Sequence, residues 1–508
     1  MSSRTSTLSN PASSESLYAK RRKIQVRDIT GRFRRFKTQA LVLLLAIYYL
    51  VPWLRWDRGP NAPDQAVLVD FPTRKFYFFF IEIWPQEVYY LTGILIMMAI
   101  GLFAITTTVG RVWCGFACPQ TVWTDLFMAV ERRIEGDRNA RLRLDQAPFS
   151  MNKALRRAAK HVVWLLIAVA TGGAWVFYFA DAPKLAVDLI HFQASTAAYV
   201  TIGILTLTTY SFAGLAREQI CTYCCPYSRF QAAMLDEHSV IVTYRTDRGE
   251  PRGKASRSAA ARVAAPQPAS APAAADSLAA FMPAGAAPRQ GDCIDCAACV
   301  TVCPTGIDIR NGQQLECINC GLCVDACDHV MDKVGRPRGL IALDTLANLN
   351  LRTTGADPNP PIRIWRPRLF VYIGLWAAVG LIMVAALVTR PNLDLSVQRD
   401  RNPLFVTLSD GSIRNGYTFH LINKKHVDRQ AVLSVEGLPG ARLFVLNMGE
   451  TPEPVLTLGP DGVSAERVFV TVPRSAVTKE STDVRFVLRD PVSGDETHYD
   501  GIFRGPGR

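Results

Sequence analysis

The chain has 508 residues, with 57 Lys or Arg against 44 Asp or Glu and a formal net charge of +13. This length exceeds that of one compact domain, so several structural units are expected. Apolar residues make up 49% of the sequence and gather into long runs. We therefore attribute the basic excess to membrane topology and contact with anionic lipid, and no nucleic-acid partner is predicted.

Five runs are long and apolar enough to cross a bilayer. Each has 17 to 23 residues and no Asp, Glu, Lys or Arg, which suits a hydrocarbon core about 30 Å thick. A single such run is also compatible with a helix in a large soluble core, but five runs flanked by basic loops indicate a membrane protein. The predicted spans are Thr38–Leu54, Val88–Gly110, His161–Ala180, Ala197–Ala216 and Leu369–Thr389.

The distribution of Lys and Arg predicts how these spans are oriented. Ten basic residues lie in the N-terminal arm, residues 1–37, and nine lie in Glu131–Lys160, whereas Asp181–Thr196 has only one. This alternation predicts a bacterial inner-membrane protein with a cytoplasmic N-terminus. No cleavable signal peptide is expected, because the first apolar run starts near residue 38 behind a long polar arm. Five crossings then leave residues 390–508 in the periplasm.

The membrane region, residues 38–235, contains an internal repeat. The second and fourth spans are each followed by an Arg, a C-x3-C-P motif and an amphipathic segment, which indicates two copies of one unit at the cytoplasmic membrane surface. Cys224 has no counterpart in the first copy. The repeated cysteines are Cys114 and Cys118 before Pro119, and Cys221 and Cys225 before Pro226.

Two geometries are open for each pair. Cysteines four residues apart share a helix face and can chelate a soft ion. Alternatively, each proline begins a helix, which leaves the preceding cysteine at the N-cap with a lowered pKa. Both geometries predict a metal-binding or redox thiol pair, although buried cysteines also serve in packing. The pattern leaves open whether these thiols hold copper, another cluster or a transient disulfide.

Eight further cysteines form two C-x2-C-x2-C-x3-C runs within residues 289–345. In two-cluster ferredoxins with this spacing, the fourth cysteine of each run ligates the other 4Fe-4S cluster. Structural zinc is the alternative, but two complete runs of four favour the clusters. The predicted iron ligands are Cys293, Cys296, Cys299 and Cys327 for one cluster, and Cys317, Cys320, Cys323 and Cys303 for the other.

Two regions of different character flank this segment. Residues 251–288 are rich in Ala, Pro and Ser and are predicted to be a disordered linker. Residues 390–508 have short alternating stretches between turn signals and no cysteine, which predicts an antiparallel sandwich that relies on its core. The predicted strands include Leu404–Leu408, Tyr417–Asn423, Ala431–Val435, Arg467–Val472 and Val484–Arg489.

Other candidate ligands are weaker. His161 and His191 flank the third span and are expected to be interfacial rather than metal or haem ligands. Met97 and Met98 are expected to pack within a span rather than to hold Cu(I). The sequence has no CxxCH motif for covalent haem and no GxGxxG fingerprint for a dinucleotide.

Together these motifs resemble the CcoG/FixG/RdxA family of cytochrome c oxidase accessory proteins. The resemblance covers most of the chain and rests on CGFACPQ, CTYCCPYSRFQ and the phrase CPTGIDIRNG joined to QLECINC. It implies a bundle of about five transmembrane helices, a ferredoxin-like α+β insertion with two 4Fe-4S clusters and a C-terminal immunoglobulin-like domain. It also implies an activity, the reduction of Cu(II) to Cu(I) during assembly of the copper–haem centre of cbb3-type oxidases.

We therefore expect electrons to pass from an unidentified cytoplasmic donor through the clusters to the C-x3-C-P cysteines, where copper is reduced. The expected partners are this donor, membrane lipid, and the cbb3-type oxidase assembly machinery or a copper chaperone. Two rivals remain open. One is a membrane ferredoxin between the quinol pool and a periplasmic reductase, and the other is a non-catalytic assembly factor.

Overall fold

The computed structural model describes residues 24–253, 290–446, 448–477 and 479–506. Most of the basic N-terminal arm and of the linker predicted at 251–288 lies outside the described residues. The chain divides into two compact units, each built from three stretches of sequence. The cluster unit comprises Met1–Tyr49, Ala99–Gly173 and Thr196–Ile373, and the sandwich unit comprises Leu50–Met98, Ala174–Ser195 and Gly374–Arg508.

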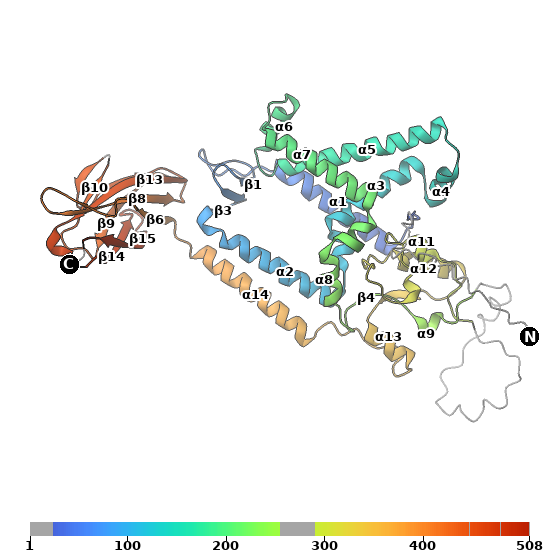
Figure 1. The fold of residues 1–508 in the computed structure, drawn as a ribbon. Helices are drawn as coiled ribbons and strands as arrows, with labels where there is room; N and C mark the ends of the chain where they lie inside the picture. The colour runs from blue at the N-terminus through green and yellow to red at the C-terminus, as the bar shows by residue number, and fades with distance from the viewer. Residues whose placement is uncertain (1–23, 254–289, 447, 478, 507–508) are drawn as a thin grey trace, which may run out of the picture. The chain divides into compact units, whose positions relative to one another are not determined.

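Five helical segments in the described residues are long and apolar enough to cross a membrane, as the sequence predicts. The third begins well before its predicted start, because its first turns carry Lys and Arg that lie outside the apolar stretch. The segments are Arg32–Trp53 (α1, Arg32–Leu50, and η1, Val51–Trp53), Pro85–Val109 (η2, Pro85–Glu87, and α2, Tyr89–Val109), Met151–Val176 (α5), Thr196–Ala216 (α7, Thr196–Thr209, and η4, Tyr210–Ala216) and Pro367–Val388 (α14) (Figure 1).

The cluster unit adds short helices and one small sheet to its membrane helices. β4 precedes the linker and pairs antiparallel with β5, which follows both cysteine runs. The other elements are η3 (Trp113–Ala117), α3 (Pro119–Glu135), α4 (Arg138–Gln146), η5 (Ile220–Cys224), α8 (Pro226–Met234), β4 (Ile241–Tyr244), α9 (Thr246–Gly249), α11 (Ala298–Thr301), η7 (Ile309–Asn311), α12 (Leu322–Lys333), β5 (Ile341–Asp344) and α13 (Leu346–Thr353).

The two ends of the linker meet in the structure. The N–H of Gly291 donates to the carbonyl of Pro251 at 2.9 Å, and the N–H of Gly253 donates to the carbonyl of Cys293 at 3.1 Å. The described residues on either side of the linker are therefore bonded to each other.

A buried acid joins α1 to the first turn of α12. The Asp325 carboxylate accepts hydrogen bonds from the backbone N–H groups of Phe33 at 3.3 Å and Arg34 at 2.8 Å. These N–H groups open α1 and have no partner within the helix, so Asp325 satisfies them and faces the positive end of the helix dipole. Arg34 also pairs with Asp125 of α3 at 2.9 Å. The cysteine-rich segment is thereby held against α1, which Arg34 in turn joins to α3.

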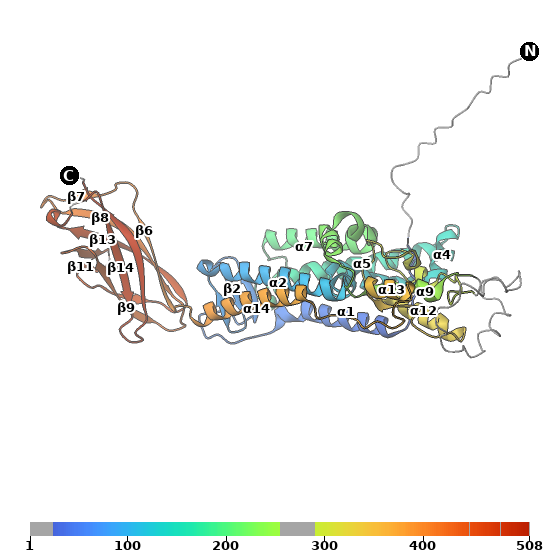
Figure 2. The ribbon, with the colours of Figure 1, turned by 90° about the horizontal axis from the view of Figure 1, so that it is seen from below.

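The sandwich unit begins with a three-stranded antiparallel sheet that the sequence analysis did not predict. β1 (Val67–Asp70), β2 (Lys75–Phe78) and β3 (Ile81–Ile83) follow the first span, and α6 (Ala182–Ile190) follows the third. Within this unit, the part of α2 up to Met98 lies beside the part of α14 from Gly374 (Figures 1 and 2). A Cβ on Gly93 would lie 2.4 Å from Met383 Sδ, so the missing side chain allows this close approach.

Two antiparallel sheets stack as layers to form the C-terminal domain (Figure 1), which confirms the predicted sandwich. One sheet has the order β11-β10-β13-β8-β6 with β7 paired to β8, and the other has the order β12-β9-β14-β15. The rings of Tyr417, Phe419 and Phe486 meet in the core between them. The elements are β6 (Leu393–Arg399), β7 (Val406–Thr407), β8 (Ile413–Asn423), β9 (Arg429–Glu436), β10 (Arg442–Val445), β11 (Gly449–Thr451), β12 (Val455–Leu458), β13 (Gly462–Val472), η8 (Arg474–Ala476), β14 (Ser481–Arg489) and β15 (Glu496–Arg504).

Candidate cluster and thiol sites

The two cysteine runs share one backbone pattern. The second and fourth residues after the first cysteine have positive φ in both runs, at Asp295 (53°) and Ala297 (53°) and at Asn319 (58°) and Gly321 (72°). A helix begins at the next residue in each case, α11 or α12. Left-handed residues at these positions turn the chain sharply, so that the first three cysteines of a run curl around one point.

The thiols of these runs line two cavities. In each cavity, three cysteines come from one run and the fourth cysteine comes from the other run, and Cys299 reaches both cavities. These groups are the same two sets that the spacing predicts as iron ligands. The first cavity is lined by Cys293, Cys296, Cys299 and Cys327, and the second by Cys303, Cys317, Cys320 and Cys323.

The walls of both cavities are largely apolar, with Met331 and Leu340 lining the first and Ile309 and Leu322 lining the second. Burial raises the pKa of Cys299, Cys317 and Cys327 to about 12. All 13 cysteines of the chain lie in its described part, and all are free thiols. Four convergent thiols in a dry cavity need a cationic centre to stabilise their thiolates, so both donor sets fit a 4Fe-4S cubane.

The two C-x3-C-P motifs also fold alike. In each copy a π-helical turn, η3 or η5, carries the first cysteine, and the proline begins an α-helix, α3 or α8. The N–H of the last cysteine donates to a carbonyl of the π-turn at 2.8 Å in both copies. Cys118 and Cys225 are therefore N-cap residues, which is the second of the two geometries that the sequence left open.

The likeness of the two copies extends to side chains and backbone angles. Thr121 Oγ1 donates to the Cys114 carbonyl at 2.5 Å, and Ser228 Oγ donates to the Cys221 carbonyl at 2.7 Å. Both hydroxyls stand three residues after the last cysteine of their motif. The residues four places before the first cysteine, Gly110 and Arg217, both have positive φ, at 62° and 36°.

The four repeated cysteines form one group instead of two separate pairs. Burial, together with the charges of Cys118, Cys114 and Cys225, raises the pKa of Cys221 to about 12. The contact between the copies agrees with this, since the Cys114 thiol donates to Gln231 of α8, the helix that begins after Cys225. Cys224 is exposed.

One expectation about these thiols is wrong. The N-cap position was expected to lower the pKa of Cys118, and the N–H groups of Thr121 and Gln120 do act in that direction. Burial outweighs them, so the pKa of Cys118 is raised.

Gln231 contacts the group of four C-x3-C-P cysteines, and the sequence analysis did not single it out. The Cys114 thiol donates to Gln231 Oε1 at 2.8 Å, and the glutamine side chain is buried. Its Nε2 atom has no hydrogen-bond partner among the residues that the structure describes. Nothing in the local pattern distinguishes this glutamine, because its role depends on α8 packing beside the other repeat.

The first C-x3-C-P turn packs directly on the loop of the second cluster cavity. Cys114 belongs to the same buried apolar group as Ile318 and Cys320. A Cβ on Gly115 would lie 2.7 Å from the Ile318 carbonyl oxygen and 3.2 Å from Cys320 Cα. The group of four C-x3-C-P cysteines and the second set of predicted iron ligands are therefore neighbours.

Two of the weaker candidate ligands, His161 and Met97, pack against neighbouring helices. His161 Nδ1 lies 2.9 Å from the Tyr210 hydroxyl, and the imidazole meets the Trp164 ring edge to face. Met97 packs near Gly380 of α14. Packing at a helix interface accounts for both side chains.

Comparison with known proteins decides the family. The chain is 50% identical to the nitrogen fixation protein FixG of Rhizobium meliloti over 517 residues, which cover 97% of this chain and 94% of that protein. It belongs to the FixG/RdxA family. The proteins RdxB and RdxA of Cereibacter sphaeroides are each 48% identical to this FixG-family chain, over 97% of it and 98% or 99% of their own lengths.

Three domain families match parts of this FixG-family chain. Residues 216–345 match a 4Fe-4S dicluster domain, residues 91–135 match a 4Fe-4S binding domain, and residues 383–506 match an IG-like fold at the C-terminal of FixG. The resemblance drawn from the motifs is therefore confirmed, as is the fold class. The chain is a multi-pass membrane protein with 4Fe-4S domains and an immunoglobulin-like C-terminal domain.

Proposed function

We propose that this protein is a membrane cupric reductase that converts Cu(II) to Cu(I) for assembly of the copper–haem centre of a cbb3-type oxidase. The observation that supports the proposal is the group of four C-x3-C-P thiols beside the second cluster cavity. Thiolates prefer Cu(I) to Cu(II), so such a group stabilises the product of a one-electron reduction.

The eight cysteines of the two runs would hold a pair of 4Fe-4S clusters, which supply single electrons when bound. Asn319 supports the second cavity, since its Oδ1 accepts from the Val242 N–H at 2.7 Å and its Nδ2 donates to the Val109 carbonyl at 3.0 Å. This side chain holds the loop of the second cavity against the end of α2, only a few residues before Cys114. The spacing between the two sites is thereby restrained.

Copper binding at the thiol group would displace protons. Burial raises the pKa of Cys118 and Cys221, so these groups are neutral thiols at pH 7 in the absence of metal. Cu(I) binds thiolates, and its uptake therefore releases protons and becomes stronger as the pH rises. The Gln231 carbonyl oxygen, which accepts from Cys114, would lose this hydrogen bond when the thiol is deprotonated.

We also propose that both C-x3-C-P motifs and residues 289–345 face the cytoplasm, and that the immunoglobulin-like domain faces the periplasm. The excess of Lys and Arg in Glu131–Lys160 supports this orientation. Free thiols in this number also suit a reducing compartment. The proposed partners are a cytoplasmic electron donor and a copper chaperone or oxidase assembly factor.

The match of residues 91–135 to a 4Fe-4S binding domain favours a second candidate function. In that case the four C-x3-C-P thiols would hold a further cluster instead of copper. The protein would then pass electrons between the quinol pool and a periplasmic reductase.

One experiment tests the first proposal and separates it from the second. Cys114, Cys118, Cys221 and Cys225 are replaced together by Ser, and the reduced, cluster-loaded protein is mixed with Cu(II) and a colorimetric Cu(I) chelator. We expect the variant to lose Cu(I) formation while keeping the iron and acid-labile sulfide of two clusters. The Cys224→Ser variant is the matched control and should reduce copper normally. Copper reduction that survives in the four-Ser variant contradicts the proposal, and a loss of about a third of the iron favours a further cluster.

A further inference from the structure

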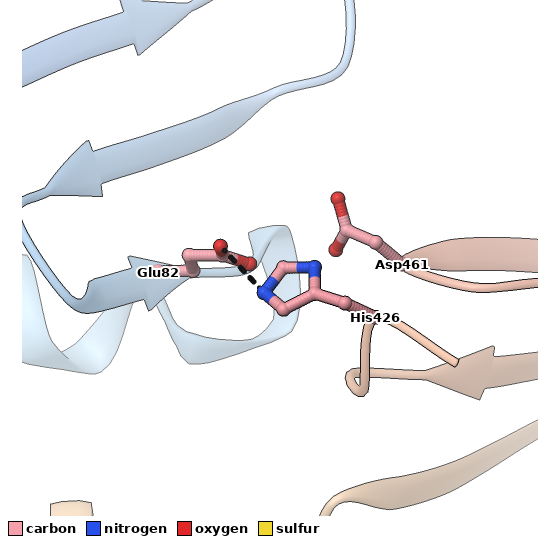
Figure 3. A group of neighbouring side chains, drawn as sticks. All are labelled: Glu82, His426 and Asp461. Atoms are coloured by element: carbon pink, nitrogen blue, oxygen red, sulfur yellow. Dashed lines mark ion pairs between the residues drawn. The ribbon is translucent and has the colours of Figure 1, made fainter. Parts of the chain in front are cut away.

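A second group of metal-donor side chains lies in the sandwich unit. Glu82 belongs to β3, His426 to the turn between β8 and β9, and Asp461 to the turn before β13. One donor atom from each residue lies within 4.8 Å of the other two. Figure 3 shows the imidazole of His426 between the two carboxylates, and its Nε2 lies 3.3 Å from Glu82 Oε1.

The two acids of this group are buried, and the imidazole reaches solvent. The side chains of Glu82 and Asp461 are 7% and 3% exposed, whereas that of His426 is 38% exposed. Among the described residues, His426 is the only ion-pair partner of the Glu82 carboxylate. A carboxylate buried to this degree, with a partner that is charged only when protonated, is costly unless a cation joins it.

The positive charge nearby does not balance both acids. Lys75 Nζ donates to Asp461 Oδ1 at 2.8 Å and to the Asp461 carbonyl at 3.0 Å, so it uses one of the two carboxylate oxygens. Lys424 pairs with a different acid, Glu87, at 2.8 Å. Burial and the charge of Asp461 raise the pKa of Glu82. The charges of His426, Lys75 and Arg58 act in the opposite direction. Among the described residues, however, Lys75 is the only permanently charged group that pairs with either carboxylate, so the cluster has room for further positive charge.

We propose that Glu82, His426 and Asp461 form a binding site for a divalent transition-metal ion, with Cu(II) bound most tightly. One imidazole nitrogen and two carboxylate oxygens are donors that suit Cu(II) and Zn(II), and Cu(II) stands highest in the affinity order of first-row divalent ions. Three protein donors leave a coordination position for water on the solvent side, beside His426. The ion would link the β1–β3 sheet to the sandwich, and it uses none of the cysteines of the proposed reductase.

The test uses the full-length protein with oxidised clusters, in which Cys114, Cys118, Cys221 and Cys225 are Ser so that they cannot consume the probe. Cu(II) is titrated and followed by electron paramagnetic resonance. We expect one equivalent of bound Cu(II) with coupling to a single imidazole nitrogen. The His426→Ala variant should lose this signal, and Glu82→Gln should raise the Kd at least tenfold. Because His426 lies on a solvent-facing turn, its replacement leaves the sandwich folded, which thermal unfolding verifies.

The His498→Ala variant is the matched control, since His498 is an exposed histidine on β15 of the same sandwich. It should bind Cu(II) as the parent does. A single-imidazole signal that persists in His426→Ala overturns the proposal, as does the absence of stoichiometric Cu(II) binding in the parent. Copper reduction is measured separately on protein that retains its four C-x3-C-P cysteines. The His426→Ala change should leave that activity intact, so a failure of either proposal is recognised without reference to the other.

Discussion

Gly115 shows how one missing Cβ positions two candidate sites. The residue stands between Cys114 and Cys118, and its Cα faces the backbone of Ile318 and Cys320. Backbone atoms cannot rotate away as a flexible side chain does, so any larger residue at this position must move one of the two loops.

Replacement of Gly115 by Ala is expected to destabilise the protein by about 1–3 kcal/mol, because the new methyl group overlaps the Ile318 carbonyl. The copper-reduction rate should fall as the turn separates from the second cavity. Thermal unfolding and the chelator assay measure these effects. Gly173→Ala is the control, since a Cβ there meets no atom within 4 Å. It should be neutral or stabilising by up to about 1 kcal/mol, and equal behaviour of the two variants would refute the packing argument.

Arg429 is a second residue that is expected to stabilise the protein strongly. Its side chain is 4% exposed, and its guanidinium pairs with Asp490 and Asp495 of the sandwich. Arg429→Met should lower the free energy of unfolding by about 3 kcal/mol, since the buried Asp490 loses its cation. Urea unfolding of the purified protein measures this loss. Arg485→Met, which breaks an exposed pair with Asp500, should change little, and a comparable loss there would contradict the assignment.

The pKa of Asp490 predicts that the sandwich loses stability at low pH. Burial acts to raise its pKa, but hydrogen bonds from the Val492 N–H, the Ser493 hydroxyl and Arg429 outweigh burial and hold the pKa well below its usual value. A depressed pKa in the folded state stabilises the fold above the unfolded pKa of about 3.9, and this contribution is lost as the pH falls through the folded pKa. Unfolding measured from pH 6 to pH 2 should show stability declining below about pH 4. Asp490→Asn should flatten this decline.

At the scale of elements, the repeat of π-turn, N-cap cysteine and α-helix sets the geometry of the thiol group. A π-turn leaves a backbone carbonyl without its usual helical partner, and the hydroxyls of Thr121 and Ser228 supply that partner. The two hydroxyls are thus part of the motif, although neither contacts a thiol in the described structure.

Thr121→Val keeps the shape of the side chain and removes its hydrogen bond to Cys114. We expect a loss of about 1–3 kcal/mol, because the buried carbonyl is left unsatisfied. Faster alkylation of the membrane thiols should accompany it as the turn loosens, which mass spectrometry can follow. Thr124→Val on the same helix, whose hydroxyl contacts Gln120 at 3.3 Å, is the matched control. Equal alkylation rates in both variants would show that the Thr121 bond does not hold the turn.

The sequence predicted elements whose signal is local and missed those whose signal is not. The apolar runs and the strands around Tyr417–Asn423 and Val484–Arg489 were found because their periodicity is strong. β10, β11 and β12 are only three or four residues long, too short for a pattern. β4 and β5 were missed because each becomes a strand only by pairing across the linker. Gln231 and Asn319 are similar cases, since their roles depend on partners far away in the chain.

At the scale of the whole molecule, the candidate spans divide the remaining chain between two sides of a membrane. In the proposed topology the β1–β3 sheet follows one span and the immunoglobulin-like domain follows five, so both are expected on the same side. Their contact through Lys75 and Asp461 agrees with this parity. The C-x3-C-P motifs follow two and four spans and are expected on the other side.

Reporter fusions test the proposed direction of this arrangement. Alkaline phosphatase, which is active only in the periplasm, should be active when fused after residue 508 and inactive when fused after residue 150. A fusion within residues 55–64, beyond the first span, should also be active. The opposite pattern would reverse the proposed orientation while leaving the span count intact.

Because Pro251 and Gly291 are hydrogen-bonded to each other, the linker between them is a suitable site for inserting another domain. When both ends of a connection are already held together, the entropy cost of closing it grows only with the logarithm of its length, about 0.6 kcal/mol per doubling. Insertion of a folded domain whose termini lie close together is therefore expected to lower the stability of this protein only slightly. A fluorescent protein placed there would report on the iron–sulfur segment from within a working chain.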